Sequence, residues 1–371
     1  MEQGRQIRVI ISGGGTGGHL FPALAIADAL KELEPSLELL FVGARGRIEM
    51  DRVPKAGYRI IGLDIQGLQR RLTWSNLLFP VKLIKSILKS NKIIKEFRPG
   101  IAVGVGGYAS GPLLLAASRK GIPTVVQEQN SYPGITNKNL AKKAQRVFVA
   151  YEGMERFFGA GKVRLTGNPV REGLLETGRK KAEGLQHFEL EEGKKTIFLT
   201  GGSLGAGTLN RSVKAHLDLL RANQVQVIWQ TGKFYYHDIK KEFSEKEYPG
   251  IRIMEFISRV DLAYAAADLI IARAGAGTIS ELCVVGKPAI LVPSPNVAED
   301  HQTKNALALA KQEAALLVRD ETATKELIPA ALQLLGNTEK QDMLARNIRR
   351  LAKPEAAREI AAEIIKIAQA S

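Results

Sequence analysis

A glycine-rich loop near the N-terminus combines residues that bind anions with a residue that moves protons. Residues 12–22 read SGGGTGGHLFP and follow the short strand-like run Arg8–Ile11. A glycine loop between a strand and a helix start presents backbone N–H groups and the positive end of the helix dipole to a phosphate. Thr16 adds a hydroxyl, and His19 adds an imidazole that can accept or donate a proton. The loop therefore predicts an enzyme that handles a phosphorylated ligand.

The same loop satisfies the G-x-G-x-x-G pattern of dinucleotide-binding proteins through Gly13, Gly15 and Gly18. That pattern also requires an acidic residue about twenty positions further on, at the end of the second strand, to bind a ribose. Here the second strand ends in Phe41–Arg45 (FVGAR), which contains no acid. Nicotinamide or flavin binding is therefore disfavoured, and a purely structural glycine turn is the other alternative.

A second glycine loop, Gly106–Pro112 (GGYASGP), follows the predicted strand Ile101–Val105. Two such loops in one domain could together surround a diphosphate. Tyr108 in this loop either donates a hydrogen bond to the ligand or packs against its neighbours, and the spacing does not distinguish between these two roles. The polar run Gln127–Asn130 follows another strand and either lines the same edge or caps that strand. The turn TGNPVR ends in Arg171, whose side chain could pair with a phosphate or with no partner.

A further glycine-rich segment, Ala274–Glu281 (AGAGTISE), opens a helix directly after the strand that ends at Arg273. The N–H groups of Gly275 to Thr278 suit a diphosphate. Glu281 lies one turn into this helix. Its carboxylate either accepts hydrogen bonds from ribose hydroxyls or only caps the helix and interacts with its dipole. Further on, residues 299–302 (EDHQ) open another helix with groups that could bind a sugar, although acids in a first helical turn are common.

Residues 74–98 combine basic with apolar and aromatic side chains. Trp74 and Leu77–Phe79 precede lysines that recur at spacings of three and four, and Glu96 is the only acid. The spacing predicts a helix with a basic face opposite leucine and isoleucine. Such a helix is typical of an element that lies on an anionic membrane surface. The alternative is a solvated helix face over an ordinary core. The basic residues are Lys82, Lys85, Lys89, Lys92, Lys95 and Arg98.

Short β-branched runs alternate with helix-length amphipathic stretches along the whole chain. This rhythm predicts an α/β fold in which parallel sheets are covered by helices on both faces. The predicted helices include Ala23–Leu33, Asn210–Arg221 and His301–Lys311. The predicted strands are Arg8–Ile11, Leu37–Val42, Arg59–Leu63, Ile101–Val105, Thr124–Glu128, Arg146–Ala150, Lys195–Thr200, Val225–Gln230, Ile251–Phe256, Leu269–Ala272, Ala289–Val292 and Ala315–Val318.

Two domains are expected, at residues 1–168 and 169–353. Charge density rises and apolar periodicity fades between Arg171 and Lys194, and a new strand then leads into Thr200–Ala206 (TGGSLGA), which echoes the first glycine loop. Two doubly wound domains facing each other would hold a ligand in the cleft at the carboxyl ends of both sheets. The pattern alone assigns the last helix, within residues 354–371, to neither domain.

The net charge of +15 points to a nucleic acid, an anionic membrane surface or a polyanionic substrate as partner. No nucleic-acid-binding module is recognisable, and aromatic residues make up only 6% of the chain, too few to suggest stacking platforms. The single cysteine, Cys283, excludes an internal disulfide and lies in an apolar run typical of a buried thiol. Glycines interrupt the charge-free segment Pro99–Ser118, so no membrane span and a cytoplasmic location are expected.

Seven motifs together resemble the MurG family of glycosyltransferases, in the family's order and spacing over nearly the whole chain. They are GGGTGGHLFPALA, GGYASGP, QEQNSYPGITNK, TGNPVR, TGGSLGA, RAGAGTISEL and EDHQTKNA. The resemblance implies the GT-B fold of two Rossmann-like domains, with the C-terminal helix returning to the first domain. It implies inverting transfer of N-acetylglucosamine from UDP-N-acetylglucosamine to the undecaprenyl-diphosphate muramyl-pentapeptide lipid of peptidoglycan synthesis, without metal or cofactor. It also implies a peripheral enzyme on the cytoplasmic face of the inner membrane, with residues 74–98 on the inner leaflet.

The resemblance assigns roles to residues in both domains. The second domain is expected to bind uracil through the backbone of Ile257, the ribose through Glu281 and the sugar hydroxyls through Gln302. His19 is the candidate base, or a structural residue of its loop, and Tyr108 is a candidate acceptor contact. Three sets of residues are expected to bind diphosphates or further parts of the donor. The donor diphosphate is expected at Ser203, Gly275, Ala276, Gly277 and Thr278, and further donor contacts are expected at Thr16, Gly17, Gly18, Asn130 and Arg171. The acceptor diphosphate is expected at Gly14, Gly15, Gly106 and Gly107.

The chain departs from the family pattern at two places. His301 stands where the family often has a second glutamine, and the loop of residues 44–49 (ARGRIE) is only a partial match. The nearest alternative functions are a UDP-N-acetylglucosamine 2-epimerase and a glycosyltransferase with a soluble acceptor. A nucleic-acid-binding protein is the alternative that is not an enzyme.

Overall fold

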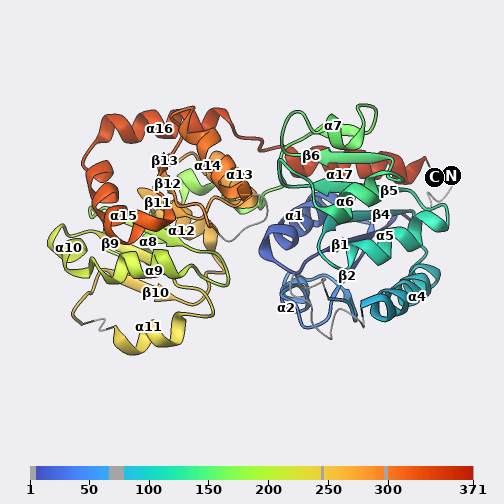
Figure 1. Cartoon of the computed structure of the whole chain (residues 1–371), viewed down its shortest axis with the longest axis horizontal. Coiled ribbons are helices and arrows are strands. Elements are labelled where there is room, and N and C mark those ends of the chain that lie inside the picture. The colour runs from blue at the N-terminus through green and yellow to red at the C-terminus, as the bar shows by residue number, and fades with distance from the viewer. Residues whose placement is uncertain (1–5, 67–78, 244–245, 296–299, 371) are drawn as a thin grey trace. The chain divides into compact units, whose positions relative to one another are not determined.

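The computed structural model describes residues 6–66, 79–243, 246–295 and 300–370. It divides into two compact units (Figure 1). Unit 1 comprises residues 1–171 together with 353–371, and unit 2 comprises residues 172–352. The last segment of the chain therefore belongs with the first. The boundary drawn from the sequence after residue 168 lies three residues before the boundary of the structure.

Unit 1 is built on a sheet of seven parallel strands in the order β3-β2-β1-β4-β5-β6-β7. Alternate residues of the strands enter different cores, as the pleat requires. Val9 and Ile11 pack with α1 and α17, whereas Ile10 packs with α4 and α5. The strands are β1 Arg8–Gly13, β2 Glu38–Ala44, β3 Ile60–Leu63, β4 Ile101–Gly106, β5 Thr124–Glu128, β6 Arg146–Val149 and β7 Val163–Leu165. The helices are α1 Gly17–Leu33, α2 Glu49–Lys55, α4 Phe79–Phe97, α5 Ser110–Arg119, α6 Ile135–Ala141, α7 Glu155–Phe158 and α17 Ala356–Gln369.

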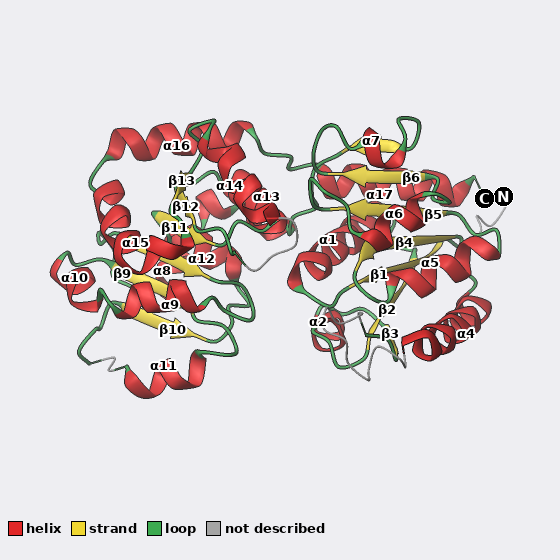
Figure 2. Cartoon of the chain, viewed as in Figure 1, coloured by secondary structure: helices red, strands yellow, loops and turns green. Residues whose placement is uncertain are grey.

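Unit 2 repeats this plan with six parallel strands in the order β10-β9-β8-β11-β12-β13 (Figure 2). Its apolar core centres on β8, β9 and β11, and Trp229 is fully buried there. The strands are β8 Thr196–Thr200, β9 Gln226–Gln230, β10 Ile251–Met254, β11 Leu269–Ala272, β12 Ala289–Leu291 and β13 Leu316–Leu317. The helices are η1 Glu172–Leu174, η2 Thr177–Arg179, α8 Lys181–His187, α9 Gly207–Lys214, α10 Leu217–Ala222, α11 Tyr236–Glu242, α12 Val260–Ala266, α13 Ala276–Val285, α14 His301–Ala310, α15 Asp320–Leu335 and α16 Thr338–Arg350.

In both sheets the strand order reverses at one place. It reverses between β1 and β4 in unit 1 and between β8 and β11 in unit 2. Ligands of doubly wound folds bind at this switch point, beyond the carboxyl ends of the strands. The four glycine-rich loops of the sequence follow these four strands, so the topology confirms the predicted fold class and gathers the loops in pairs.

Several element boundaries differ from the predicted ones. Helix α1 begins at Gly17, six residues before the predicted start, because the tertiary environment holds Gly17 and Gly18 in a helix despite their low propensity. The predicted helix Asn210–Arg221 is two helices, α9 and α10. The break follows from His216, whose ring Nδ1 lies 2.9 Å from the Ser212 carbonyl that a continuing helix would use. Strand β7, at the edge of the sheet, was not predicted.

Helix α17 completes the core of unit 1. Ile360, Ile364 and Ile367 are buried among the side chains of α1 and β1. Arg146 Nε lies 3.1 Å from Glu363 Oε1, which joins this helix to β6. None of the helices in the described ranges is long and apolar enough to cross a membrane.

Candidate functional site

The two glycine loops of unit 1 pack backbone against backbone. A Cβ atom at Gly107 would lie 2.3 Å from the carbonyl oxygen of Gly14, and Gly107 has a φ of +88°. Only glycine permits this approach. Tyr108 is 44% exposed, near Gly15, and its ring lies 5.6 Å from the Arg47 guanidinium carbon. The structure therefore brings Gly14, Gly15, Gly106, Gly107 and Tyr108 together, as the hypothesis of a shared diphosphate site requires.

A buried carboxylate lies beneath the first loop. Glu49 is 1% exposed, and its two carboxylate oxygens accept hydrogen bonds from the N–H groups of Gly15 and Ala44 at 2.7 and 2.9 Å. The N–H of Gly15 is therefore bonded to an internal anion, so this donor is already occupied at the predicted acceptor-diphosphate site. Sequence reasoning missed Glu49 because it lies in a helix start 34 residues away. The available signal was that Glu49 ends the segment ARGRIE, which matches the family pattern in part.

The unsatisfied donors of this loop lie at the start of α1. Thr16 is its N-cap in an extended conformation, with no side-chain capping bond. Its carbonyl accepts from the N–H groups of His19 and Leu20, so Gly17 and Gly18 provide the first N–H groups of the helix. The Arg171 guanidinium lies 4.3 Å from the ring centre of Phe21, one turn further along α1. Thr16, Gly17, Gly18 and Arg171 thus lie around one helix end.

His19 is held by a group of buried amides. Its Nδ1 lies 2.9 Å from Gln129 Oε1, and Gln129 Nε2 donates to the Val105 carbonyl at 2.7 Å. Gly106, with a φ of +107°, leaves room for the ring, because a Cβ there would lie 2.6 Å from His19 Nδ1. Asn130 lies at the same strand end, where its side chain and backbone nitrogens donate to Glu128 at 3.2 and 3.0 Å.

The start of α13 is the corresponding candidate anion site in unit 2. Gly275 is the N-cap, no acid lies in the first turn, and a Cβ at Gly277 would meet nothing within 4 Å. The first N–H groups of this helix therefore face open space beside Gly277. Glu281 lies in the second turn, and the hydroxyl of the buried Tyr264 donates to it at 3.0 Å. Tyr264, which the sequence analysis missed, orients the carboxylate expected at the ribose.

The loop after β8 forms a tight turn next to the loop after β9. Gly202 and Gly205 have φ values of +82° and +88°, and a Cβ at Gly232 would lie 2.1 Å from the nitrogen of Gly205. Ser203 lies at the turn, and its carbonyl accepts from the N–H of Lys233 at 3.1 Å. The N–H of the buried Ile257 donates to Gln230 Oε1 at 2.9 Å. Because that N–H is bonded, recognition of uracil by this residue would use its carbonyl oxygen.

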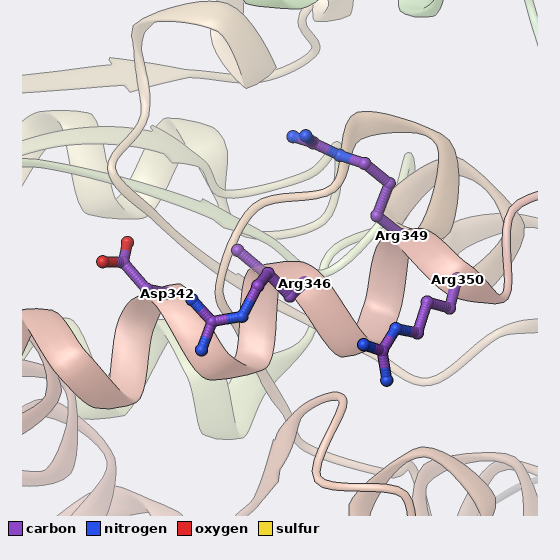
Figure 3. Close-up of a pocket in the computed structure, with 5 residues that line it drawn as sticks. Asp342, Arg346, Arg349 and Arg350 are labelled. Atoms are coloured by element: carbon purple, nitrogen blue, oxygen red, sulfur yellow. The ribbon is translucent and has the colours of Figure 1, made fainter.

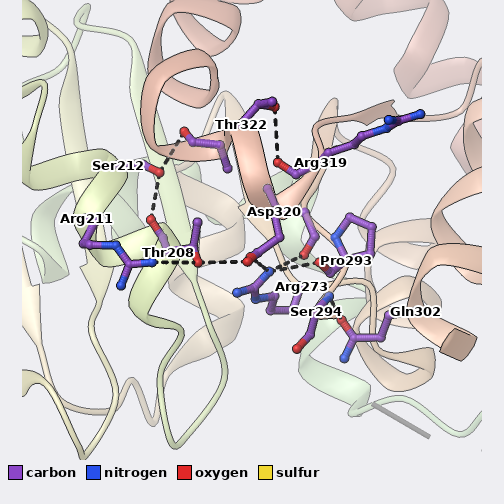
Figure 4. Close-up of polar contacts among 12 residues, drawn as sticks. Thr208, Arg211, Ser212, Arg273, Pro293, Ser294, Gln302, Arg319, Asp320 and Thr322 are labelled. Atoms are coloured by element: carbon purple, nitrogen blue, oxygen red, sulfur yellow. Dashed lines mark hydrogen bonds and ion pairs between the residues drawn. The ribbon is translucent and has the colours of Figure 1, made fainter. Parts of the chain in front are cut away.

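An ion pair links the loops of unit 2 (Figure 4). Arg273 Nη1 donates to the carbonyl oxygens of Val292 and Pro293, both at 3.1 Å, and to Asp320 Oδ1 at 2.5 Å. Asp320 Oδ2 in turn accepts from the Thr208 hydroxyl at 3.0 Å. Nearby, Gln302 Oε1 accepts from the N–H of Ser294 at 2.9 Å. The pair thus connects the end of β11, the end of β12 and the starts of α9 and α15, which carry or flank the predicted donor residues.

The outer face of α4 differs from the prediction. Val81, Ile84 and Leu88 are 48%, 58% and 63% exposed, on the same side of the helix as Lys85 and Lys92. The inward side carries Ser86, Ser90, Ile93 and Ile94 instead. Ile93 and Ile94 are buried and Leu83 packs against the core, as predicted, but Ile84 and Leu88 share the outer face with lysines. The predicted separation of a basic face from a leucine and isoleucine face therefore holds only in part. Trp74, Leu77 and Leu78, the aromatic and apolar flank of the prediction, lie outside the described residues.

A pocket of about 480 Å³ on α16 contains none of the predicted site residues. It is lined by Asp342, Ala345, Arg346, Arg349 and Arg350, and Arg349 points away from Arg346 and Arg350 (Figure 3). Among the described residues, no three His, Cys, Asp or Glu side chains gather as metal ligands would. Cys283 is buried as predicted, and burial raises the pKa of its thiol to about 12.

Comparisons with known proteins agree on one family. The glycosyltransferase family 28 N-terminal domain matches residues 9–149, and the family 28 C-terminal domain matches residues 196–364. A Bacteroides fragilis protein is 54% identical over 371 residues, covering 100% of this chain and 98% of its own length. A Parabacteroides distasonis protein is 55% identical over 365 residues, 98% and 99% of the two chains. Both are named UDP-N-acetylglucosamine--N-acetylmuramyl-(pentapeptide) pyrophosphoryl-undecaprenol N-acetylglucosamine transferase.

Solved structures give the same result. The crystal structure of Acinetobacter baumannii MurG is similar with a TM-score of 0.74 and 28% identity, over 98% of this chain and all of that one. The UDP-GlcNAc 2-epimerase from Neisseria meningitidis reaches a TM-score of 0.68 over 98% and 100% of the chains, but at 16% identity it shares only the fold. Full-length identity above one half to transferases of one name, with both family 28 domains in order, shows that this chain belongs to the MurG family of glycosyltransferases.

Proposed function

We propose that this protein transfers N-acetylglucosamine from UDP-N-acetylglucosamine to N-acetylmuramyl-(pentapeptide) pyrophosphoryl-undecaprenol, with inversion at the anomeric carbon. The observation that carries the proposal is the pair of glycine loops at the switch point of each sheet, in a chain more than half identical to transferases of that name. One pair suits the diphosphate of the donor and the other the diphosphate of the acceptor.

The donor is proposed to bind unit 2. The helix start at Gly275–Thr278 offers N–H groups and a helix dipole to the UDP diphosphate, with Ser203 beside it on the neighbouring loop. Glu281 would accept hydrogen bonds from the ribose hydroxyls while Tyr264 holds one of its oxygens. The N–H groups stabilise the charge that develops on the departing UDP, because they are fixed in place before the reaction begins.

The acceptor is proposed to bind unit 1, which also supplies the proposed base. The acceptor hydroxyl attacks the anomeric carbon and gives its proton to His19, while the bond from that carbon to the UDP oxygen breaks and its electron pair leaves with UDP. Gly106 and Gly107 would face the acceptor diphosphate. Tyr108, half exposed on the second loop, would contact the acceptor.

The outer face of α4 is proposed to lie on the anionic inner leaflet at the cytoplasmic side of the membrane, where the lipid acceptor resides. The exposed Val81, Ile84 and Leu88 would enter the interface, and Lys85 and Lys92 would approach the headgroups. Changing the three apolar residues to serine is expected to lower binding to anionic phospholipid vesicles about tenfold. The matched control is Leu165→Ser, an exposed leucine of β7. Equal vesicle binding by the triple variant and the control would contradict this orientation.

Product analysis tests the proposed reaction. The protein is incubated with radiolabelled UDP-N-acetylglucosamine and the lipid acceptor, and the label is followed into the organic phase. The proposal predicts label in the lipid and a β-linked sugar by NMR, since an α-linked donor reacts with inversion. Label recovered as N-acetylmannosamine would identify an epimerase instead, and untouched donor with folded protein would overturn the donor assignment.

A further inference from the structure

The contact between His19 and Gln129 determines where the histidine carries its hydrogen. His19 Nδ1 lies 2.9 Å from Gln129 Oε1. An amide oxygen can only accept a hydrogen bond, so Nδ1 must be the donor. A neutral imidazole with its hydrogen on Nδ1 has its lone pair on Nε2.

The orientation of the Gln129 amide is fixed independently of His19. Its Nε2 donates to the Val105 carbonyl at 2.7 Å and also to Gln127 Oε1. A flipped amide would place its oxygen against these two oxygens, in a region where Gln129 is 2% exposed. Gln127 Nε2 donates to Asn168 Oδ1 at 2.9 Å, and Asn168 Nδ2 donates to the Gln129 carbonyl at 3.1 Å. Every amide of this group therefore has one consistent orientation.

We propose that Gln129 is a positioning residue of the transfer reaction, which holds His19 in the Nδ1–H tautomer and so makes Nε2 the atom that accepts the acceptor's proton. This inference rests on the proposed function, since it presumes that His19 is the base. In the step, the hydroxyl proton moves to Nε2, the oxygen bonds to the anomeric carbon, and UDP leaves with the electron pair of the broken bond. The imidazolium that forms keeps its Nδ1–H bond to Gln129.

The choice of an amide rather than a carboxylate has a physical reason. A carboxylate in this place would also fix the tautomer, but it would add a negative charge beside loops proposed to bind a diphosphate. The nearby Glu49 carboxylate is already satisfied by the N–H groups of Gly15 and Ala44. The neutral amide oxygen of Gln129 orients the His19 ring without repelling the anionic substrate.

Nitrogen NMR of the full chain tests the tautomer without depending on activity. The chain has 5 histidines, so ¹⁵N-labelled imidazoles can be assigned by comparison with His19→Gln. We expect the hydrogen on Nδ1 of His19 in the wild type and its loss from Nδ1 in Gln129→Met. His216 is the internal control, because its Nδ1 lies 2.9 Å from the Ser212 backbone carbonyl and should keep its hydrogen in every variant. A wild-type His19 with its hydrogen on Nε2 overturns the proposal.

Kinetics separates positioning from a structural role. Gln129→Met is expected to lower kcat at least about tenfold with the affinity for UDP-N-acetylglucosamine kept. Gln129→Glu keeps an oxygen for His19 Nδ1 but loses the Nε2 donor to the Val105 carbonyl and Gln127 Oε1, so it is expected to keep the Nδ1–H tautomer at a lower free energy of unfolding. Wild-type kcat in a Gln129→Met protein whose His216 signal is unchanged overturns the proposal. If the NMR results hold but no protein transfers sugar, the tautomer assignment stands and the transfer function fails.

Discussion

Glu49 gives unit 1 an anion of its own beneath the first glycine loop. Its carboxylate bonds to Gly15 and Ala44, so it joins the end of β1 to the end of β2. In the proposed site, a negative charge under the loop would favour contact of a diphosphate with the outer N–H groups of Gly17 and Gly18 at the start of α1. At the residue scale the sequence predicts which residue types meet at the site, but not this bond. Local spacing does not encode a partner 34 residues away, in another helix.

Glu49→Gln tests the role of this buried carboxylate. An amide offers one oxygen where the carboxylate offers two, so one of the two N–H groups meets an NH₂ group. The free energy of unfolding of unit 1 is expected to fall by about 2 kcal/mol, the cost of a lost charge-assisted bond and an unsatisfied buried donor. Urea unfolding measures it, with the exposed Glu152→Gln as matched control. Equal stability of the two variants would show that Glu49 does not hold the loop.

Lys287 makes the stability of unit 2 depend on pH. Burial lowers the pKa of its ammonium group from 10.5 to about 8, and its Nζ donates to the carbonyls of Ala265 and Ala267 at 2.6 Å. A neutral amine can still make both bonds. Between these two pKa values the unfolded chain binds a proton that the folded chain has released, so the free energy of unfolding rises with pH in this window.

The predicted contribution of Lys287 is a rise of about 2 kcal/mol between about pH 7.5 and pH 9.5, compared with Lys287→Met. Methionine keeps most of the buried volume and does not titrate. Urea unfolding of both proteins at the two pH values isolates the difference. A difference that stays constant with pH would mean that the ammonium keeps its ordinary pKa in the fold.

At the scale of elements, the ends of parallel strands place the chemistry. All four glycine loops could be predicted because each follows a short apolar run and precedes a helix. Their pairing follows from the strand orders, which the sequence does not state directly. Helix boundaries were less predictable, because the start of α1 and the break between α9 and α10 depend on tertiary contacts rather than on propensity.

The Arg273–Asp320 pair is expected to fix the relative positions of the segments after β11 and β12, which flank the proposed donor site. Arg273→Met removes the donor shared by the Val292 and Pro293 carbonyls and leaves Asp320 without its cation. We expect the Kd for UDP-N-acetylglucosamine to rise about tenfold by calorimetry, because the loops must then be ordered by the ligand. Arg211→Met is the matched control, since Arg211 bonds only the outer end of this network, at Thr208. An unchanged Kd in Arg273→Met would contradict this role.

At the scale of the whole molecule, two sheets of the same topology are each completed by their own helices. The chain returns to unit 1 for its last helix, and Ile360, Ile364 and Ile367 fill the core beside α1. The amphipathic pattern of residues 354–371 predicts a packed helix but not its partner. Only the family resemblance pointed to the first domain, since an apolar stripe fits any complementary surface.

Ile364→Ala is expected to destabilise unit 1 selectively. Deleting a fully buried isoleucine side chain costs about 2–5 kcal/mol. Hydrogen exchange should therefore lose protection at β1 while protection at β8 of unit 2 is kept. The converse variant is Leu344→Ala, whose side chain is buried in the core of unit 2. Equal losses at both strands in both variants would contradict the division into separate cores.

The most direct test of the whole account is the rate of sugar transfer by His19→Ala at saturating UDP-N-acetylglucosamine, read beside the donor Kd of the same protein. The donor is proposed to bind unit 2, and the proposed base lies in unit 1. We therefore predict that kcat falls about a hundredfold or more, as for the loss of a general base, while the donor Kd stays within about twofold of the wild type. Near-wild-type turnover by His19→Ala would contradict the assignment of the base and with it the proposed mechanism.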